Sequence, residues 1–333
     1  MIEVNLLNLK KNVETIRKTS KGLIGVVKND AYGCGIVEVG NYLVEIGVSY
    51  LLVNDIDEAL KLVNSGVKVP ILLFNGLNRD DYHYLNKYPN LVISINSYMN
   101  LLDLVTHFNG EFTIQIQIDT ALNRSGIKDM TEYDDLLKLI DKENRVRVDG
   151  IFTHFANPKM AVSQLEEFKK YVNKREFKMV HCSASSTYDL IDYGNFVRCG
   201  LALYNINQVM RVVSKPLVIR DVKKGETIGY NGLYRASEDI KVAVIPIGYG
   251  NGYRLKLSGF NVYTNGNYYK VIGQICMNHI FVLIDDYVDM NSVFELTSEN
   301  LRADSLADYL GTSTYEIYTN FHFDKRVYIK WDI

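Results

Sequence analysis

Lys28 is the residue of this sequence that points most directly to chemistry. It ends the β-type run 23–28 and opens the polar part of VVKNDAYGCG. A lysine amine that is desolvated at the end of a buried strand has a lowered pKa and can form a Schiff base with an aldehyde. The alternative is a structural lysine whose stem is buried while its charge reaches solvent. Taken alone, Lys28 leaves both interpretations open.

More polar residues stand at the ends of later β-type runs, the place where catalytic groups gather in parallel barrels. They are Asp119, Arg124, His154, Ser183, Ser185 and Arg198. A single buried histidine or arginine is usually structural. A lysine, a histidine, serines and two arginines that converge on one rim indicate a functional site instead.

The elements that must position these residues alternate between two patterns. Short β-type runs are separated by segments in which apolar residues recur three and four apart. The runs are 23–28, 50–54, 70–74, 91–95, 112–118, 146–152, 177–183 and 196–199. This alternation predicts an α/β fold, a (β/α)8 TIM-type barrel, over residues 1–211. A doubly wound open sheet is the alternative, but the sequence has no G-x-G-x-x-G turn.

The pattern changes after the barrel. Residues 212–333 contain β-rich runs separated by turn residues, with a hairpin turn expected at TNGN (264–267) and one short helix at 303–311. These features predict a separate, mostly-β C-terminal domain.

Composition excludes several functional classes. Lys plus Arg number 37 and Asp plus Glu number 39, a net charge of −2, so we expect no nucleic-acid or anionic-membrane binding. No run approaches the roughly 20 apolar residues of a membrane span, and the N-terminus lacks a secretory pattern. The four cysteines form no CxxC pair, so we expect free thiols in a cytoplasmic protein and no metal site.

Eight strings along the chain carry a family resemblance. Besides VVKNDAYGCG they are DTALNRSG, GIFTHFA, HCSASS, VRCGLALYN, GETIGYNGLY, IGYGNGY and GQICMNH. In this order the strings resemble the alanine racemases, which are amino-acid racemases of fold type III that depend on pyridoxal 5′-phosphate (PLP). The resemblance implies PLP as the cofactor and interconversion of L- and D-alanine.

The resemblance also implies roles for the two acid/base residues. Lys28 resembles the lysine that holds PLP and moves a proton on one face of the substrate. Tyr230 is similar to the opposing acid/base, which the partner subunit supplies, so we expect a head-to-tail homodimer with shared active sites. His154 resembles the histidine that hydrogen-bonds this tyrosine. Arg198 resembles the arginine that stands behind that histidine and faces the pyridine nitrogen of PLP.

The remaining site residues follow from the same resemblance. Arg124 and Met277 are similar to the contacts of the substrate carboxylate, and Tyr249 to the tyrosine that lines the substrate's path. The residues that resemble the cofactor's phosphate-binding shell are Tyr32, Ser185, Gly200 and Leu201.

Several positions depart from the family pattern. Gln117 stands where many members carry a carbamylated lysine that supports Arg124, and Asn278 stands where an aspartate is common. The family's extra phosphate-binding tyrosine is replaced by Phe321, His322 or Phe323. Because these changes lie close to the expected substrate site, alanine is the default substrate, and a larger or charged amino acid remains an alternative.

Three further interpretations stay open. A PLP-dependent decarboxylase would present a carboxylate to the pyridine nitrogen and carry a Gly-rich phosphate loop, and Arg198 and the absence of a GGG run argue against it. A single-domain PLP-binding barrel without robust catalysis would lack the C-terminal domain. The third is a degenerate racemase that binds amino acids without turnover.

Overall fold

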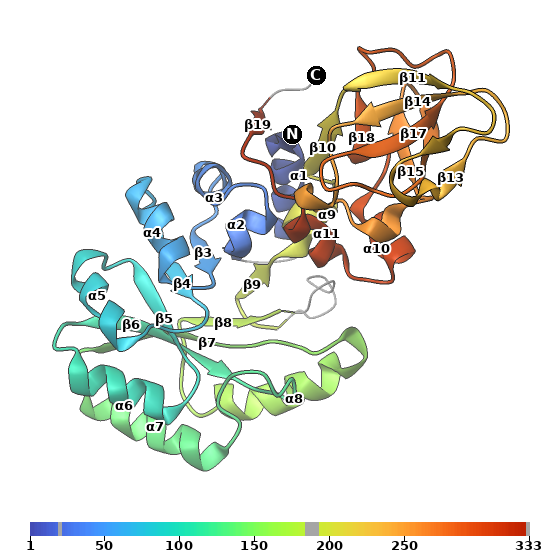
Figure 1. The fold of residues 1–333 in the computed structure, drawn as a ribbon. Helices are drawn as coiled ribbons and strands as arrows, with labels where there is room; N and C mark the ends of the chain where they lie inside the picture. Colours follow the sequence, from blue (N-terminus) through green and yellow to red (C-terminus); the bar gives the residue numbers. More distant parts are fainter. Residues whose placement is uncertain (19–21, 184–192, 331–333) are drawn as a thin grey trace. The chain divides into compact units, whose positions relative to one another are not determined.

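The computed structural model describes residues 1–18, 22–183 and 193–330 (Figure 1). The chain forms two compact units. The sheet unit consists of Met1–Leu9, Tyr32–Cys34 and Asn207–Ile333, and the barrel unit of Lys10–Ala31 and Gly35–Ile206.

The barrel unit confirms the predicted (β/α)8 architecture. Within its described residues, eight parallel strands close into a barrel in chain order. The strands are β2 (Leu23–Val26), β3 (Tyr50–Val53), β4 (Ile71–Leu73), β5 (Leu91–Ile95), β6 (Phe112–Ile118), β7 (Val146–Thr153), β8 (Met179–Cys182) and β9 (Phe196–Cys199). Every residue of β2, β3, β4 and β5 is buried, which explains why these strands appear in the sequence as short, continuous apolar runs.

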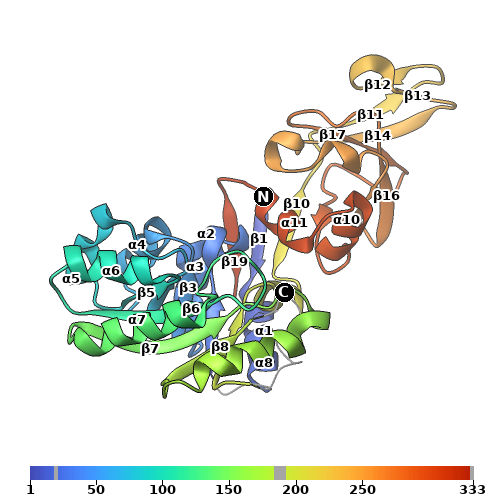
Figure 2. The same ribbon diagram turned by 90° about the horizontal axis from the view of Figure 1, so that it is seen from below.

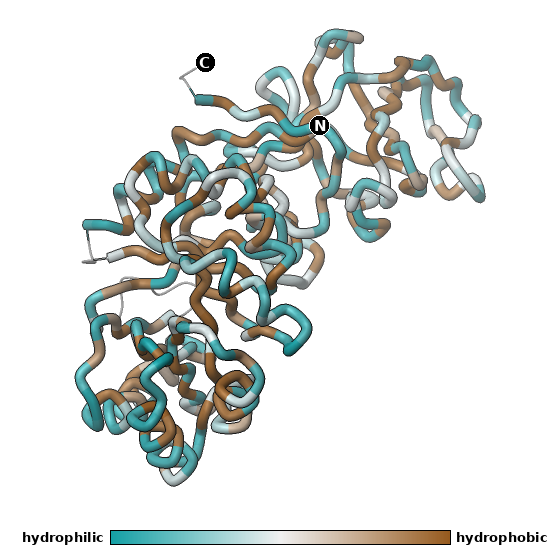
Figure 3. The backbone as a smooth tube through the Cα atoms, turned by 90° about the vertical axis from the view of Figure 1, so that its left-hand side faces the viewer, coloured by the Kyte–Doolittle hydropathy of each residue, from teal (hydrophilic) through white to brown (hydrophobic). Residues whose placement is uncertain are grey.

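Helices connect the strands and place their apolar faces inward. They are α1 (Leu6–Arg17), α2 (Lys28–Tyr32), α3 (Ile36–Glu45), α4 (Ile56–Asn64), α5 (His83–Lys87), α6 (Tyr98–His107), α7 (Met130–Lys142), α8 (Ala161–Val172) and α9 (Leu201–Asn205). Apolar and polar stretches alternate along them in Figure 3, as expected for helices with one buried face. Side-chain caps define the starts of α4, α6 and α7, where Asp55, Ser97 and Asp129 each accept a hydrogen bond from a backbone N–H.

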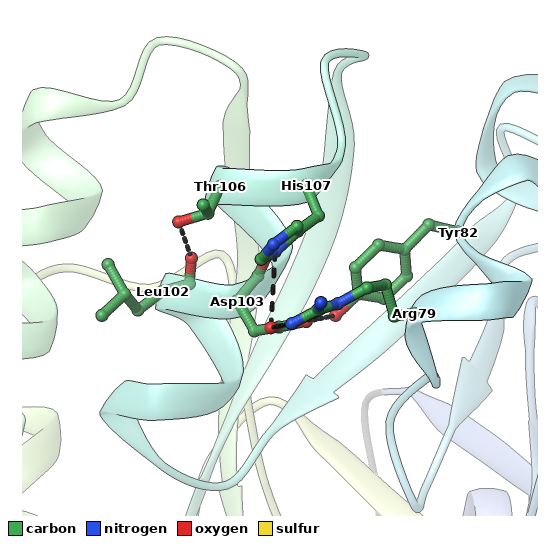
Figure 4. Close-up of polar contacts among 6 residues, drawn as sticks. All are labelled: Arg79, Tyr82, Leu102, Asp103, Thr106 and His107. Carbon is green, nitrogen blue, oxygen red and sulfur yellow. Dashed lines mark hydrogen bonds and ion pairs between the residues drawn. The ribbon is translucent and has the colours of Figure 1, made fainter.

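A polar cluster joins α6 to the short 3₁₀ helix η1 (Arg79–Asp81) (Figure 4). Asp103 accepts hydrogen bonds from the Arg79 guanidinium and, at 2.8 Å, from the Tyr82 hydroxyl. The Nδ1 atom of His107 lies 3.4 Å from the same carboxylate. These hydrogen bonds, led by that of Arg79, lower the pKa of Asp103, so the carboxylate stays charged and holds the loop after β4 against α6.

The sheet unit is built around a sheet of nine described strands in the order β11-β14-β17-β16-β15-β18-β10-β1-β19. Their bounds are β1 (Ile2–Asn5), β10 (Met210–Ser214), β11 (Val218–Val222), β14 (Ile240–Ile245), β15 (Asn261–Thr264), β16 (Asn267–Ile272), β17 (Ile280–Ile284), β18 (Phe294–Thr297) and β19 (Arg326–Ile329). The expected hairpin joins β15 to β16 through Asn265 and Gly266, whose φ angles of 49° and 84° suit a two-residue turn. The mostly-β prediction is therefore confirmed.

Three features of the sheet unit were not predicted. Strand β1, from the start of the chain, lies between β10 and β19 in this sheet, and Figure 2 shows it beside β19. The expected helix forms as α10 (Ala303–Leu310), and a second helix, α11 (Thr314–Asn320), follows it. Every residue of strand β18 is buried, so the exposed and buried positions do not alternate in the way that would predict a half-buried strand. None of the helices in the described part of the chain is long and apolar enough to span a membrane.

Candidate functional site

Lys28 begins an unusual backbone turn at the end of β2. The four residues after it, Asn29, Asp30, Ala31 and Tyr32, all have φ between 52° and 57°, which forms a left-handed turn without glycine. Such a turn costs roughly 1–2 kcal/mol per residue, so its surroundings must hold it in place. The Ala31 amide donates to the Val27 carbonyl at 2.8 Å, and the Asp30 carboxylate accepts from the Ile36 amide at 2.9 Å.

Glu58 provides a second support for this turn. One carboxylate oxygen accepts from the Asp30 amide at 3.2 Å, and the other from the Asn54 amide at 2.9 Å. The turn that follows Lys28 is thereby linked to the end of β3. This arrangement gives the Lys28 side chain a defined origin at the carboxyl end of the barrel.

The aromatic ring of Phe74, at the end of β4, is the centre of the candidate site. The Lys28 Nζ atom lies 5.7 Å from the ring centroid, and the Cζ atoms of Arg124 and Arg198 lie 5.4 and 5.7 Å from it. The structure thus brings together three cations that the sequence analysis placed in one site. Phe74 itself was missed, and its only sequence signal is an aromatic residue that ends an apolar run.

This arrangement concentrates positive charge. Burial lowers the pKa of the Lys28 amine, and the charges of Arg124 and Arg198 lower it further. Within the described residues, neither the Lys28 amine nor the Arg124 guanidinium forms a hydrogen bond or an ion pair with another side chain. A lysine with a lowered pKa has a larger neutral fraction near pH 7, and the neutral amine is the nucleophilic form.

Asp119 shapes the loop that presents Arg124. Its carboxylate accepts from the backbone amides of Ala121, Asn123 and Arg124 at 2.9, 3.0 and 3.1 Å. The loop returns to β6 at Gly126, where φ is 121° and an added Cβ would lie 2.7 Å from the Asp119 nitrogen. Contacts with Asp119 therefore hold both the start and the end of the loop.

Gln117, one of the departures from the resembled family pattern, holds the backbone of this loop. Its side-chain nitrogen donates to the Ser125 carbonyl at 3.0 Å, and its oxygen accepts from the Ser94 hydroxyl at 3.3 Å. Gln117 is 2% exposed, so these neutral hydrogen bonds form in the barrel interior. The amide supports the Arg124 loop without supplying negative charge.

His154 and Arg198 form a pair with a defined protonation state. The Nη2 atom of Arg198 donates to the Thr153 carbonyl at 3.1 Å and to His154 Nδ1 at 3.3 Å. Burial and the nearby cations lower the pKa of His154 to about 3, so its ring is neutral near pH 7. Because arginine can only donate, His154 Nδ1 accepts, and the ring proton resides on Nε2.

The sheet unit contains three further predicted side chains, those of Tyr230, Tyr249 and Met277. Tyr230 lies in η3 (Tyr230–Gly232), inside the hairpin of β12 (Thr227–Ile228) and β13 (Tyr234–Arg235), and is 66% exposed. Tyr249 and Met277 are also exposed, and the Tyr249 amide donates to the Cys276 carbonyl at 3.1 Å. The loop around Met277 is also tied to the Tyr230 hairpin, because Asn231 donates to Gln274 at 3.0 Å. The three residues therefore lie on neighbouring loops of one unit.

The predicted phosphate-binding residues have varied positions. Gly200 and Leu201 stand at the start of α9 in the barrel unit. Tyr32 belongs to the sheet unit and is 5% exposed. Its ring centroid lies 5.9 Å from that of Tyr315. Ser185 lies outside the described residues. Of the C-terminal alternatives, Phe321 is buried and His322 is exposed.

Comparisons with known proteins agree along the whole chain. Residues 4–208 match the alanine racemase N-terminal domain, and residues 209–329 match the alanine racemase C-terminal domain. An alanine racemase of Staphylococcus epidermidis is 28% identical over 350 residues, which covers 96% of this chain and 91% of the relative.

Two solved structures extend this finding. The alanine racemase from Bartonella henselae with covalently bound pyridoxal phosphate has a TM-score of 0.89 at 25% identity, and 99% of each chain is covered. A histidine racemase from Leuconostoc mesenteroides also has a TM-score of 0.89, at 19% identity over 99% of this chain and 97% of that one, and it shows the fold alone. Since both family domains match in order and together span nearly all 333 residues, this chain belongs to the alanine racemase family.

Proposed function

We propose that this protein is a PLP-dependent amino-acid racemase that interconverts L- and D-alanine. The observation that carries the proposal is the convergence of Lys28, Arg124 and Arg198 on the ring of Phe74. Membership of the alanine racemase family supports the reaction class, and the Bartonella relative supports the cofactor.

The residues around Phe74 fit an anionic, planar cofactor. Three cations repel one another there, so a phosphate, a phenolic oxygen and a substrate carboxylate would each lower the energy of the site. When bound, PLP supplies an aldehyde that condenses with amines and a ring that stabilises negative charge on the substrate's α-carbon. Lys28 would hold it, with Tyr32, Ser185, Gly200 and Leu201 proposed around its phosphate.

Arg198 would face the pyridine nitrogen. A guanidinium donates and does not accept, so Arg198 would leave that nitrogen unprotonated when the cofactor is bound. Arg198 would thereby limit electron withdrawal by the cofactor ring and disfavour side reactions such as transamination. Arg124 and Met277 would position the substrate carboxylate, and Tyr249 would line the substrate's path.

Racemisation requires acid/base groups on both faces of the α-carbon. We propose Lys28 on one face and Tyr230 of the partner subunit on the other, in a homodimer whose 212–333 domains contribute the tyrosine. A phenol with an ordinary pKa near 10 is a poor base near pH 7. The Nε2–H of neutral His154 would donate to the phenolic oxygen and stabilise its ionised form.

The substrate is the finer part of the proposal. Alanine is supported by the relatives named alanine racemase, and a racemase of a larger or charged amino acid is the second candidate. Gln117 and Asn278, neutral amides at positions where the family resemblance implies charged residues, add to the case for testing a panel of amino acids.

The first experiment is absorbance spectroscopy of the purified protein, followed by enantiomer analysis. We expect the visible absorbance of a lysine-bound cofactor in the wild type and its loss in Lys28→Ala. Incubation with single enantiomers of alanine, histidine and other amino acids, followed by chiral chromatography, identifies the substrate. Release of CO2 in place of the opposite enantiomer would establish a decarboxylase, and no turnover of any amino acid would contradict the racemase proposal.

The second experiment tests the two-base arrangement. Tyr230→Phe removes one base, so we expect racemisation to fall about 10²- to 10⁴-fold in both directions. Exchange of the α-hydrogen with deuterated water should persist for the one enantiomer whose hydrogen faces Lys28. Unchanged racemisation in Tyr230→Phe, or exchange lost equally for both enantiomers, would contradict the arrangement.

A further inference from the structure

A continuous line of hydrogen-bonded side chains runs through the interior of the barrel from Arg198. Arg198 Nη1 lies 2.8 Å from His181 Nδ1, and His181 Nε2 lies 2.7 Å from the Gln115 side-chain oxygen. The Gln115 nitrogen donates to the Tyr50 hydroxyl at 2.9 Å, and this hydroxyl donates to Asp149 at 3.1 Å. Arg198, His181, Gln115 and Tyr50 are each 3% exposed or less.

The line ends at the opposite end of the barrel from the candidate site. Tyr50 is the first residue of β3, and Lys178, which pairs with Asp149 at 2.9 Å, directly precedes β8. Lys28, Arg124 and His154 instead follow the last residues of their strands. The line therefore connects Arg198 to the amino end of the strands.

A local irregularity of the sheet places Asp149. Strands β6 and β7 pair in register until Ile114 faces Val148, and Gln115 then faces Gly150, so Asp149 is an extra residue in β7. Bulges are rare in parallel pairs and re-aim a side chain. Here the bulge lets Asp149 bond Tyr50 while its neighbours keep their pairing with β6.

Each hydrogen bond of the line has one possible direction. Arginine only donates, so His181 Nδ1 accepts, and a neutral imidazole then carries its proton on Nε2. Nε2–H donates to the Gln115 oxygen, which leaves the amide nitrogen as donor to Tyr50 and the hydroxyl hydrogen for Asp149. Burial and Arg198 lower the pKa of His181, so the ring stays neutral. Phe152 stacks on it with ring centroids 4.9 Å apart and fixes its plane.

We infer that His181, Gln115, Tyr50 and Asp149 are positioning residues for Arg198, in a line whose donor direction is set by the Arg198 guanidinium at one end and the Asp149 carboxylate at the other. The same guanidinium also donates to His154 at 3.3 Å. The line therefore aligns Arg198 for the cofactor and, through it, the His154 tautomer. These effects rest on the proposed function, whereas the direction of the line does not.

Two buried tyrosines provide a matched test. Tyr50→Phe removes the hydroxyl that joins Gln115 to Asp149. Tyr133→Phe removes an equally buried hydroxyl that donates to the Tyr171 carbonyl at 3.2 Å and belongs to no such line. We expect kcat to fall about fivefold or more in Tyr50→Phe, the size typical of one lost hydrogen bond, and less than about twofold in Tyr133→Phe. A similar kcat in the two variants overturns the inference.

The direct readout is 15N NMR of the histidine rings in the purified holoenzyme. We expect His181 as the neutral Nε2–H tautomer from pH 8 to pH 5 in the wild type and in both variants, because Arg198 donates to Nδ1 in all three. The resonance of the Nε2–H group should keep its wild-type position in Tyr133→Phe and shift in Tyr50→Phe, where the Gln115 amide loses the hydroxyl that orients it. An unshifted resonance in Tyr50→Phe overturns the inference. A protonated ring or an Nδ1–H tautomer in the wild type overturns the inference. This signal is independent of turnover, so failure of the proposed function alone leaves it unchanged.

Asp149 supplies a second pair of variants if Tyr50→Phe does not fold. Asp149→Asn keeps an oxygen that can accept from Tyr50, and Asp149→Leu does not. We expect the wild-type position of the His181 Nε2–H resonance and at least about half of kcat to survive in Asp149→Asn and both to be lost in Asp149→Leu. If Asp149→Leu preserves both, the line has no positioning role.

Discussion

Phe74 gives the cations of the barrel site a shared aromatic face. A cation near such a face gains roughly 0.5–2 kcal/mol, which offsets part of the mutual repulsion of Lys28, Arg124 and Arg198. Burial and then the remaining repulsion lower the pKa of Lys28. An anionic ligand would relieve it, so binding of such a ligand and the charge state of the lysine are coupled.

His154 makes the free energy of unfolding depend on pH. Its folded pKa of about 3 lies below the usual value near 6.5, so protons bind preferentially to the unfolded chain. Its contribution to stability is fully present above pH 6.5 and is lost as pH falls toward 3, by at most about 1.4 kcal/mol per pH unit.

We therefore expect the free energy of unfolding to fall less steeply from pH 7.5 to pH 5 in His154→Asn than in the wild type. Urea unfolding at several pH values measures this slope. Identical slopes in the two proteins would show that His154 titrates normally in the folded state.

Two loops of the barrel unit position the site through residues with positive φ. The left-handed turn after Lys28 is held by Glu58 and Asp30, and the Arg124 loop is held by Asp119 and Gln117. The half-buried Glu58 accepts two backbone N–H groups at the Lys28 turn, and the buried Asp119 accepts three in the Arg124 loop. These hydrogen bonds replace the strand-to-strand hydrogen bonds that end with the strands. The geometry of each cationic side chain therefore depends on an acidic residue that does not touch it.

Gly126→Ala tests the Arg124 loop. The new Cβ would lie 2.7 Å from the Asp119 nitrogen, so the loop must move, and we expect a loss of about 1–3 kcal/mol in stability and a several-fold higher KM for the amino acid.

Gly66→Ala is the control, because Gly66 also has a positive φ, 101°, but no atom lies within 4 Å of its added Cβ. We expect the control to lose stability without a change in KM. An equal KM in both variants would mean that the Arg124 loop does not set substrate binding.

For the whole molecule, the proposal requires residues of both units in one active site. Lys28 belongs to the barrel unit, and Tyr230 is an exposed residue of the sheet unit. We propose that Tyr230 acts on substrate in the active site that contains Lys28 of a second subunit, as expected of a two-fold dimer with equivalent interfaces.

Mixing two inactive variants tests this proposal. If Lys28→Ala and Tyr230→Phe subunits are unfolded together and refolded as random dimers, half are heterodimers, and each has one intact site of two. We expect about a quarter of wild-type activity to return. No recovery, with heterodimers verified by mass spectrometry, would place both residues in the same subunit.

The sequence was sufficient for much of the architecture. Fully buried parallel strands such as β2 and β5 appear as short apolar runs, and the hairpin at Asn265–Gly266 follows from residues that accept positive φ. Strand β1 was missed because its partners β10 and β19 lie some 200 or more residues away along the chain. No local pattern reports such a pairing.

The sequence by itself determined the fold class, the family resemblance and the identity of the cationic side chains, because strand periodicity and motif strings are local properties of the chain. Only the tertiary structure decided that Phe74 lies among those cations, that four residues after Lys28 turn left-handed, and that Asp149 reaches Tyr50. These features arise where the closing barrel brings separate strands together, and their geometry depends on contacts between residues far apart in sequence.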